Sequence, residues 1–162
     1  MTNLDDVQVY RKLDPEDMLE ELHGFPQQCR AAWHEARDFK LPQSYAQVDK
    51  VVILGMGGSA VGGDLVRGLA IGIAKPVIVV SHEYDLPHFV DERTLVIASS
   101  YSGDTEEILS AFSQALKKNC KKLAVTTGGK LKPMAEEAKI PVFTIDIVLP
   151  PGWRWDIASC LY

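Results

Sequence analysis

The sequence predicts an α/β fold, a doubly wound three-layer sandwich with a five-stranded parallel sheet, preceded by N-terminal helices. Short, unbroken apolar runs such as 51–54 and 95–98 are typical of parallel strands that are covered on both faces. After Pro42 these runs alternate with segments that carry apolar residues at helical spacing. Such alternation predicts right-handed crossovers, and it places ligand sites beyond the carboxyl ends of the strands.

Two helices are expected before the sheet. Asp14 precedes a proline and two acids, which is the pattern of a helix N-cap and first turn. This helix should end at Gly24, and a second should run from about Pro26 to Phe39. Trp33 is expected to face the core. The apolar positions that should pack inward are Met18, Leu19 and Leu22, followed by Cys29, Ala32, Trp33, Ala36 and Phe39.

The alternating part of the chain predicts five strands and three helices. In the first helix Val61, Leu65 and Leu69 should face the sheet. A polar loop is expected over 81–91. The predicted strands are 51–54, 77–80, 95–98, 123–125 and 142–145, and the predicted helices are 59–71, 105–119 and 134–139.

The segment Val96–Leu109 carries the strongest functional signal. A strand there runs into a helix through a turn with several hydroxyl residues and one glycine. Such a turn directs backbone N–H groups and hydroxyl donors at one point, where phosphate commonly binds. In a purely structural alternative, Ser102 or Asp104 caps the helix and Asp104 forms a capping box with Glu107. The number of hydroxyls exceeds what one cap needs, so we favour an anion site.

Two more turns are expected at the same edge of the sheet. Residues 55–60 read Gly-Met-Gly-Gly-Ser-Ala, and glycines let backbone amides approach a ligand closely. They also fit the dinucleotide fingerprint G-x-G-x-x-A, with Glu83 as a late candidate for the ribose-binding acid. Gly62 and Gly63 are interpreted as packing glycines. The other turn, 126–130, is either a plain loop or a pocket wall made by Thr127, Gly128 and Gly129.

No catalytic group stands out in this sequence. Ser100 replaces the first glycine that a nucleophile elbow around Ser102 would need. His82 and His88 fall in the polar loop, where we expect bystanders. Adjacent glutamates such as Glu106 and Glu107 do not face each other on a helix, so they form no acid–base couple.

Composition narrows the class of protein. The net charge is -5 and no basic stripe appears, which argues against nucleic acid as a partner. The apolar runs are too short to span a membrane, and the polar, acidic N-terminus is not expected to be a signal peptide. Three distant cysteines predict a reducing cytoplasm, with neither a disulfide framework nor a zinc site. His23 and His34 have no ligand-spaced partner, so no metal is expected.

Together the three turns resemble those of the SIS, or sugar isomerase, domain, and especially of the bifunctional phosphoglucose/phosphomannose isomerases. The shared motifs are Gly-Met-Gly-Gly-Ser, Ser-Tyr-Ser-Gly-Asp-Thr-Glu-Glu and Thr-Gly-Gly-Lys-Leu, in a match over about 50–145. Asp104 stands where the family often has asparagine, and its carboxylate suits a phosphate only if it points away. The resemblance implies that sugar phosphate contacts Gly57, Gly58, Ser59, Ser100, Ser102 and Thr105.

The resemblance also implies a reaction. Such enzymes convert glucose 6-phosphate or mannose 6-phosphate to fructose 6-phosphate through an enediolate, without a cofactor. Their base and ring-opening groups come from a second SIS domain, and nothing in this chain matches them. We therefore expect a cytoplasmic sugar-phosphate-binding domain that forms a homodimer or lacks its second SIS domain. The alternatives are a stand-alone sugar-phosphate-binding regulatory module and a dinucleotide-binding domain.

The expected domains are a helical lead-in over 1–45, a SIS domain over 46–149 and an atypical tail over 150–162. After Ile145 the family continues with a segment like Pro-Arg-Ala-Ala-Leu-Gly-Tyr, but here Pro151 begins Pro-Gly-Trp-Arg-Trp. A shifted reading frame across that stretch permits Arg-Val-Ala-Leu-Gly-Tyr. We hypothesise that a frameshift makes 151–162 off-frame sequence, so Arg154 is not read as the family's phosphate-binding arginine.

Overall fold

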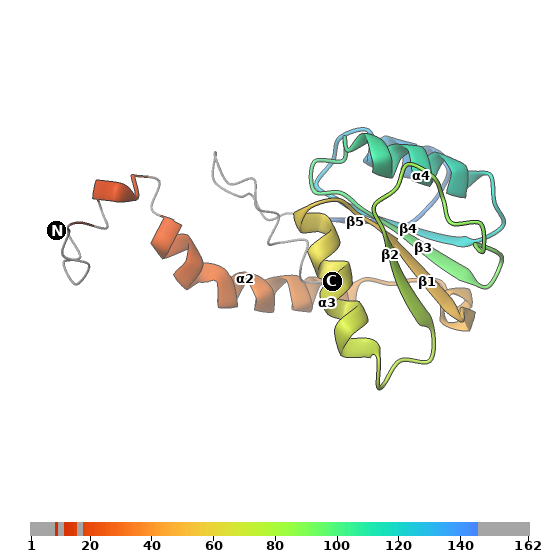
Figure 1. Cartoon of the computed structure of the whole chain (residues 1–162), viewed down its shortest axis with the longest axis horizontal. Helices are drawn as coiled ribbons and strands as arrows, with labels where there is room; N and C mark the ends of the chain where they lie inside the picture. The colour runs from red at the N-terminus through yellow and green to blue at the C-terminus, as the bar shows by residue number, and fades with distance from the viewer. Residues whose placement is uncertain (1–8, 10–11, 16–17, 146–162) are drawn as a thin grey trace.

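The computed structural model describes residue 9 and residues 12–15 and 18–145 (Figure 1). Within them, five parallel strands form one sheet in the order β2-β1-β3-β4-β5. The predicted five-stranded parallel sheet is thereby confirmed. The strands are β1 Lys50–Leu54, β2 Val77–Ser81, β3 Thr94–Ser99, β4 Lys121–Thr126 and β5 Val142–Thr144.

Helices cover both faces of this sheet, as the predicted sandwich requires. Helices α4 and α5 pack on one face, while α3 and the end of α2 lie on the other (Figure 1). Helix α5 begins three residues earlier than the predicted Met134. The helices are α2 Met18–Asp38, α3 Gly58–Ala70, α4 Glu106–Leu116 and α5 Leu131–Glu137, with a 3-10 turn, η1, at Gln43–Gln47.

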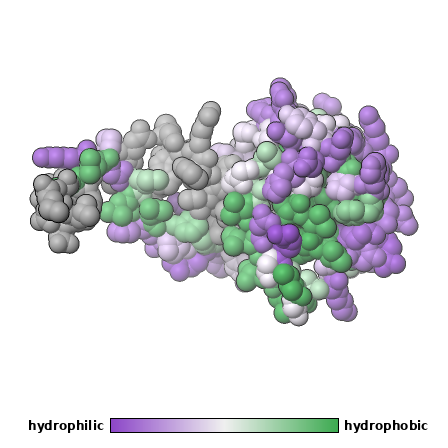
Figure 2. Space-filling view, viewed as in Figure 1, coloured by the Kyte–Doolittle hydropathy of each residue, from purple (hydrophilic) through white to green (hydrophobic). Residues whose placement is uncertain are grey.

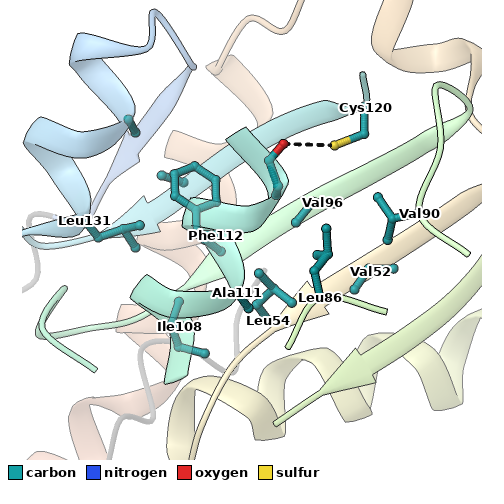
Figure 3. Packing of buried hydrophobic residues seen from close by; sticks show 14 residues of the cluster. Val52, Leu54, Leu86, Val90, Val96, Ile108, Ala111, Phe112, Cys120 and Leu131 are labelled. Carbon is teal, nitrogen blue, oxygen red and sulfur yellow. Dashed lines mark hydrogen bonds between the residues drawn. The ribbon is translucent and has the colours of Figure 1, made fainter. Parts of the chain in front are cut away.

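The larger core lies between the sheet and α4. Val96 and Ala98 of β3 face this side and are fully buried, as is Phe112 of α4 (Figure 3). The alternate residue Leu95 packs on the opposite face in a second cluster. Successive side chains of this apolar run point to opposite faces of the sheet, so one strand contributes to two apolar layers. A sheet covered on both faces requires this arrangement.

The N-terminal helix differs from the prediction. Helix α2 runs without a break through Gly24 and Pro26, where two separate helices were expected. Asp14 does act at its start, because its carboxylate accepts the N–H groups of Met18 and Leu19 at 2.8 Å each. Trp33 is 63% exposed, so its expected core position is wrong.

The reason for this difference is the course of α2. Most of the helix extends away from the sheet, so only its C-terminal end touches the core (Figure 1). Ala32 is 2% exposed and Ala36 packs against the second cluster, whereas Met18, Leu19 and Leu22 are exposed. The predicted inward face of the first turns is therefore wrong. A proline within the helix leaves the carbonyl four residues earlier unbonded, and that loss is tolerable where water can reach the carbonyl.

Helix α3 is turned around relative to the prediction. Val61, Leu65 and Leu69 point away from the sheet, with exposures of 47%, 52% and 77%. The small residues face inward instead. A Cβ added to Gly63 would lie 3.1 Å from the Ile53 side chain and 3.2 Å from Val80. This glycine therefore lets the helix sit close to β1 and β2, as its interpretation as a packing glycine predicts.

Some expectations fall outside these residues. The expected tail at 150–162, including Arg154, lies outside the described residues, as do Glu16 and Asp17 of the predicted helix start. Over the described ranges, no helix is both long and apolar enough to cross a membrane.

Candidate functional site at the carboxyl edge of the sheet

The three polar turns lie together at the carboxyl edge of the sheet. We call 55–59 the first turn, 100–105 the second and 126–130 the third. They follow β1, β3 and β4, which are neighbours in the parallel sheet. Hydrogen bonds join the second turn to both of the others. The chain therefore brings its three polar turns together at the edge where doubly wound sheets bind ligands.

Ser59 joins the first turn to the second. Its side chain is only 3% exposed. The hydroxyl oxygen accepts the Tyr101 N–H at 3.3 Å, and the Ser59 carbonyl accepts the Ser99 hydroxyl at 3.3 Å. Gly57, with φ 55°, precedes α3 and supplies no capping side chain. Ser59 thus fixes the spacing of the two turns, beside an exposed Gly57 and a half-buried Gly58.

Ser100 and Thr105 form a hydroxyl pair within the second turn. Their oxygens are 3.0 Å apart, and Ser100 also accepts the Gly103 N–H at 3.1 Å. Ser100 is 2% exposed, whereas Thr105 is half-buried and reaches the surface. Thr105 is the N-cap residue of α4, yet its side chain makes no capping hydrogen bond. The pair therefore stands at a helix start whose first N–H groups need another acceptor.

Neither Ser102 nor Asp104 caps α4, so the capping alternative is wrong. The exposed Ser102 hydroxyl accepts the Asp104 N–H at 3.3 Å, within the turn. One Asp104 carboxylate oxygen accepts the Lys130 N–H at 3.2 Å. Asp104 consequently points to the third turn, which is the orientation that a phosphate at this helix start would require.

The third turn is bound to the second through its backbone. The Thr127 hydroxyl donates to the Tyr101 carbonyl at 2.7 Å, so this predicted wall residue has a structural partner. The Leu131 N–H donates to the Gly103 carbonyl at 2.9 Å. Gly128 is half-buried and Gly129 is exposed, next to this junction. All the predicted site residues thus occupy one connected group of turns.

Two contributors escaped the sequence reasoning. Tyr101 acts through its backbone, because its N–H and carbonyl hold the first and third turns. A backbone role leaves no signal in the residue type. His82, expected to be a bystander, lies beside the first turn with Nδ1 2.9 Å from the Gly55 carbonyl oxygen. The sequence did hold a signal for His82, because it follows β2 directly and β2 ends at the same carboxyl edge of the sheet as the three turns.

The charge near the second turn is negative. Glu106 and Glu107 lie in the first turn of α4. The Glu107 carboxylate, with burial and Glu106, raises the pKa of the Tyr84 hydroxyl. Acids favour a helix N-terminus but repel an anionic ligand, so a phosphate here depends on N–H and hydroxyl donors. Among the described residues, no three His, Cys, Asp or Glu side chains group as a metal site.

Comparison with known proteins identifies relatives by sequence, and two of them are enzymes of the same name. The bifunctional phosphoglucose/phosphomannose isomerase of Caldicellulosiruptor bescii is 45% identical over 134 residues, 83% of this chain and 40% of that protein. The enzyme of the same name from Thermoplasma acidophilum is 48% identical over 92 residues, 56% of this chain and 29% of that protein. This chain therefore spans well under half the length of these relatives.

A solved structure shares the fold. It is the Vibrio vulnificus NanR protein complexed with ManNAc-6P, with a TM-score of 0.61 and 17% identity over 94% of this chain and 62% of that one. The family model described as "SIS domain" matches residues 44–148, more than half of the chain. With the parallel sheet and the three joined turns in place, this match shows that the chain belongs to the SIS-domain family.

Proposed function

We propose that this chain binds a phosphorylated hexose at the carboxyl edge of its sheet. The ligands that fit the relatives' names are glucose 6-phosphate, mannose 6-phosphate and fructose 6-phosphate. A SIS-like fold in complex with ManNAc-6P supports the same class of ligand. The proposed contacts are Gly57, Gly58, Ser59, Ser100, Ser102 and Thr105, with Thr127, Gly128 and Gly129 as a wall.

The Ser100–Thr105 pair is the observation that carries this proposal. Two hydroxyls 3.0 Å apart share one hydrogen between them, which leaves one O–H to donate elsewhere. Ser100 is buried and Thr105 reaches the surface, so we assign the outward O–H to Thr105. It stands at the N-terminus of α4, where N–H groups and the helix dipole favour an anion.

The isomerisation is part of the proposal for a longer assembly. The chain spans 40% of the Caldicellulosiruptor relative, and we infer that the base and ring-opening groups come from a second SIS domain, as the resemblance implies. We propose binding as the function of this chain by itself, and isomerisation as the function of an assembly that supplies those groups. The proposed division is a helical lead-in at 1–45, a SIS domain at 46–149 and a tail at 150–162.

We propose a cytoplasmic location and no cofactor for this domain. The ligand class is a metabolite of sugar-phosphate chemistry, and the described cysteines, Cys29 and Cys120, are free thiols. A reducing compartment keeps such thiols unpaired. Either a second copy of the chain or a second SIS domain completes the proposed assembly.

Calorimetric titration tests the ligand proposal. Fructose 6-phosphate should bind, inorganic phosphate should compete, and unphosphorylated fructose should not bind. Replacing Thr105 or Ser102 by alanine should weaken binding by about 1–3 kcal/mol each, the usual loss for a hydrogen bond to a charged group. Ser113→Ala is the matched control, because the Ser113 hydroxyl donates to the Ser110 carbonyl within α4.

The outcomes separate the proposal from its rivals. Equal affinity in the wild type, Thr105→Ala and Ser113→Ala would refute the assigned site. Binding of NADH that survives the Thr105 change would instead favour a dinucleotide-binding domain.

A further inference from the structure

His82 contacts the first turn with one ring nitrogen and leaves the other open. Its Nδ1 lies 2.9 Å from the Gly55 carbonyl oxygen. A carbonyl oxygen only accepts, so Nδ1 carries the hydrogen in this contact. In the neutral ring the lone pair then belongs to Nε2, which has no partner among the residues that the structure describes. Because His82 is exposed, Nε2 can accept a hydrogen bond from a bound molecule.

The loop at 82–93, which joins β2 to β3, is fixed along α4. The Gln114 amide N–H donates to the Tyr84 carbonyl at 2.9 Å, and its amide oxygen accepts the Leu86 N–H at 3.1 Å. Leu86 is 5% exposed and packs in the larger core. His82 therefore projects from a segment that is already held in place, which lowers the cost of ordering its ring when a ligand binds.

The position of His82 suits the end of a hexose 6-phosphate that is remote from the phosphate. The strand order places the end of β2 on one side of the first turn and the second turn on the other. Two strand spacings, about 10 Å, separate the ends of β2 and β3. An extended hexose 6-phosphate can span that distance. A phosphate held in the second turn thus allows its sugar to reach His82 across the first turn.

The opposite direction along the edge is less suited to a sugar. There the third turn binds the second directly, and polar groups are used in doing so. The Thr127 hydroxyl donates to the Tyr101 carbonyl at 2.7 Å. The Lys130 N–H donates to the Asp104 carboxylate at 3.2 Å. These contacts engage donors that a sugar hydroxyl would otherwise meet, so the open acceptor on the β2 side is the better partner.

The charges near His82 favour neutral sugar hydroxyls over a second phosphate. Exposed Glu83 follows it in the loop, and Glu106 and Glu107 lie in the first turn of α4. Glu107 also raises the pKa of the Tyr84 hydroxyl, so the loop and the start of α4 lie close together. Figure 2 shows hydrophilic residues over α4 and this loop. A second anionic group placed here would be repelled by these carboxylates.

We propose that His82 is a specificity-determining residue of the sugar-phosphate site, whose Nε2 accepts a hydrogen bond from a hydroxyl at the far end of the sugar. This inference rests on the proposed function. It narrows the ligand class to monophosphates that carry neutral hydroxyls at the end remote from the phosphate. The contact is a hydrogen bond alone, and His82 is given no part in the isomerisation.

Two amide variants separate the roles of the two ring nitrogens. In His82→Asn the side-chain N–H takes the place of Nδ1 and can still donate to Gly55, but nothing replaces Nε2. In His82→Gln the amide reaches the place of Nε2, and its oxygen can accept the sugar hydroxyl. Calorimetry of the full chain with fructose 6-phosphate should show about threefold to tenfold weaker binding for His82→Asn. His82→Gln should recover part of that loss.

Glycerol 3-phosphate is the control ligand, because it is too short to reach His82 from the second turn. Its affinity should be the same for the wild type and His82→Asn. His88→Asn is the control variant, since His88 is exposed in the same loop and its carbonyl, not its ring, accepts Lys118. Fructose 1,6-bisphosphate should bind more weakly than fructose 6-phosphate, because its second phosphate would face the carboxylates.

Nitrogen NMR of the labelled imidazole reads the contact without any variant. In the neutral ring of the free chain, the hydrogen of His82 should be found on Nδ1. Fructose 6-phosphate should shift the Nε2 resonance, and glycerol 3-phosphate should leave it in place. A hydrogen found on Nε2 instead would contradict the role of acceptor.

The binding results tell this inference apart from the proposed function. If Thr105→Ala weakens fructose 6-phosphate binding and His82→Asn does not, the sugar-phosphate site stands and the role of His82 is overturned. Equal losses for fructose 6-phosphate and glycerol 3-phosphate in His82→Asn would also overturn it, because the residue would then act on the phosphate or the first turn. Equal affinity for the bisphosphate would contradict the ligand class. A wild-type chain that binds neither monophosphate refutes the proposed function, and this contact with it.

Discussion

Gly103 of the second turn and Gly129 of the third pack against each other's backbone. Both adopt left-handed conformations, with φ of 70° and 59°. A Cβ on Gly103 would overlap the Gly128 carbonyl, and one on Gly129 would overlap the Ser102 carbonyl. Only glycine fits both positions, so this contact sets the distance between two turns of the candidate site.

Alanine at either position should therefore destabilise the fold. Gly103→Ala and Gly129→Ala should each lower the free energy of unfolding by more than the roughly 1–2 kcal/mol that a left-handed conformation costs a residue with a Cβ. The loss is larger because rigid backbone blocks the new methyl group. Gly68→Ala is the control, because Gly68 lies within α3, has no positive φ and has nothing within 4 Å of its would-be Cβ. It should not destabilise the chain, since alanine is favoured over glycine in a helix. Urea unfolding measures all three variants, and losses of no more than about 2 kcal/mol at Gly103 and Gly129 would show that the backbone contact adds nothing.

A second prediction concerns pH and the ion pair between Lys50 and Asp91. The Lys50 Nζ lies 2.8 Å from Asp91 Oδ2. Hydrogen bonding to Lys50 lowers the pKa of Asp91, and hydrogen bonding to Asp91 raises the pKa of Lys50. The stabilisation of the fold by ionised Asp91 is complete above the ordinary pKa of about 4 and is lost as pH falls through the lowered pKa of Asp91. The stabilisation by charged Lys50 is complete below about pH 10 and is lost as pH rises through the raised pKa of Lys50.

Asp91→Asn should lower the melting temperature most between these limits. The difference from the wild type should shrink in acid, where Asp91 is protonated, and in strong alkali, where Lys50 is neutral. Glu92→Gln, at the exposed neighbouring position, serves as the control. Melting curves across the pH range check this, and a difference that is constant with pH would contradict the ion-pair explanation.

A third prediction concerns the continuous helix α2. Pro26→Ala restores an N–H that can bond the Leu22 carbonyl, so it should stabilise the helix locally, by up to about 3 kcal/mol. Hydrogen exchange should slow in 18–30, while the melting temperature of the sheet should change little because this part of α2 extends away from it (Figure 1). Pro42→Ala, just before η1, should leave that exchange unchanged. Unaltered exchange in Pro26→Ala would favour the two separate helices that the sequence predicts.

The sheet and its three turns were predictable because their signals are local. An apolar run such as Leu95–Ala98 has one stable place, between two helical layers, and glycine and hydroxyl residues follow the runs of β1, β3 and β4 at their carboxyl ends. Parallel strand order then brings those turns to a single edge without any further information.

The orientation of α3 was not predictable from its pattern. Hydrophobic periodicity assigns the larger apolar residues to the core, and it therefore placed Leu65 inward. Close packing decided otherwise, since the flat side around Gly63 approaches Ile53 more closely than a leucine face could. Likewise, Trp33 looked like a core residue, but the core ends where α2 leaves the sheet.

The roles of individual residues within the candidate site could be assigned only from the structure. The sequence indicated Ser59 and Ser100 as ligand contacts, and the structure gives both of them partners within the turns. The backbone of Tyr101 links all three turns, and no side-chain pattern reports that.

The most direct test of the central claim is an amide NMR titration of the isotope-labelled chain with fructose 6-phosphate. The first amides of α4, at Glu106, Glu107 and Ile108, and the Thr105 amide should shift as the ligand saturates the site. Those shifts should be absent with fructose and should disappear in Thr105→Ala. Amide shifts confined to other parts of the chain, or the same shifts with fructose, would contradict a phosphate site at this helix start.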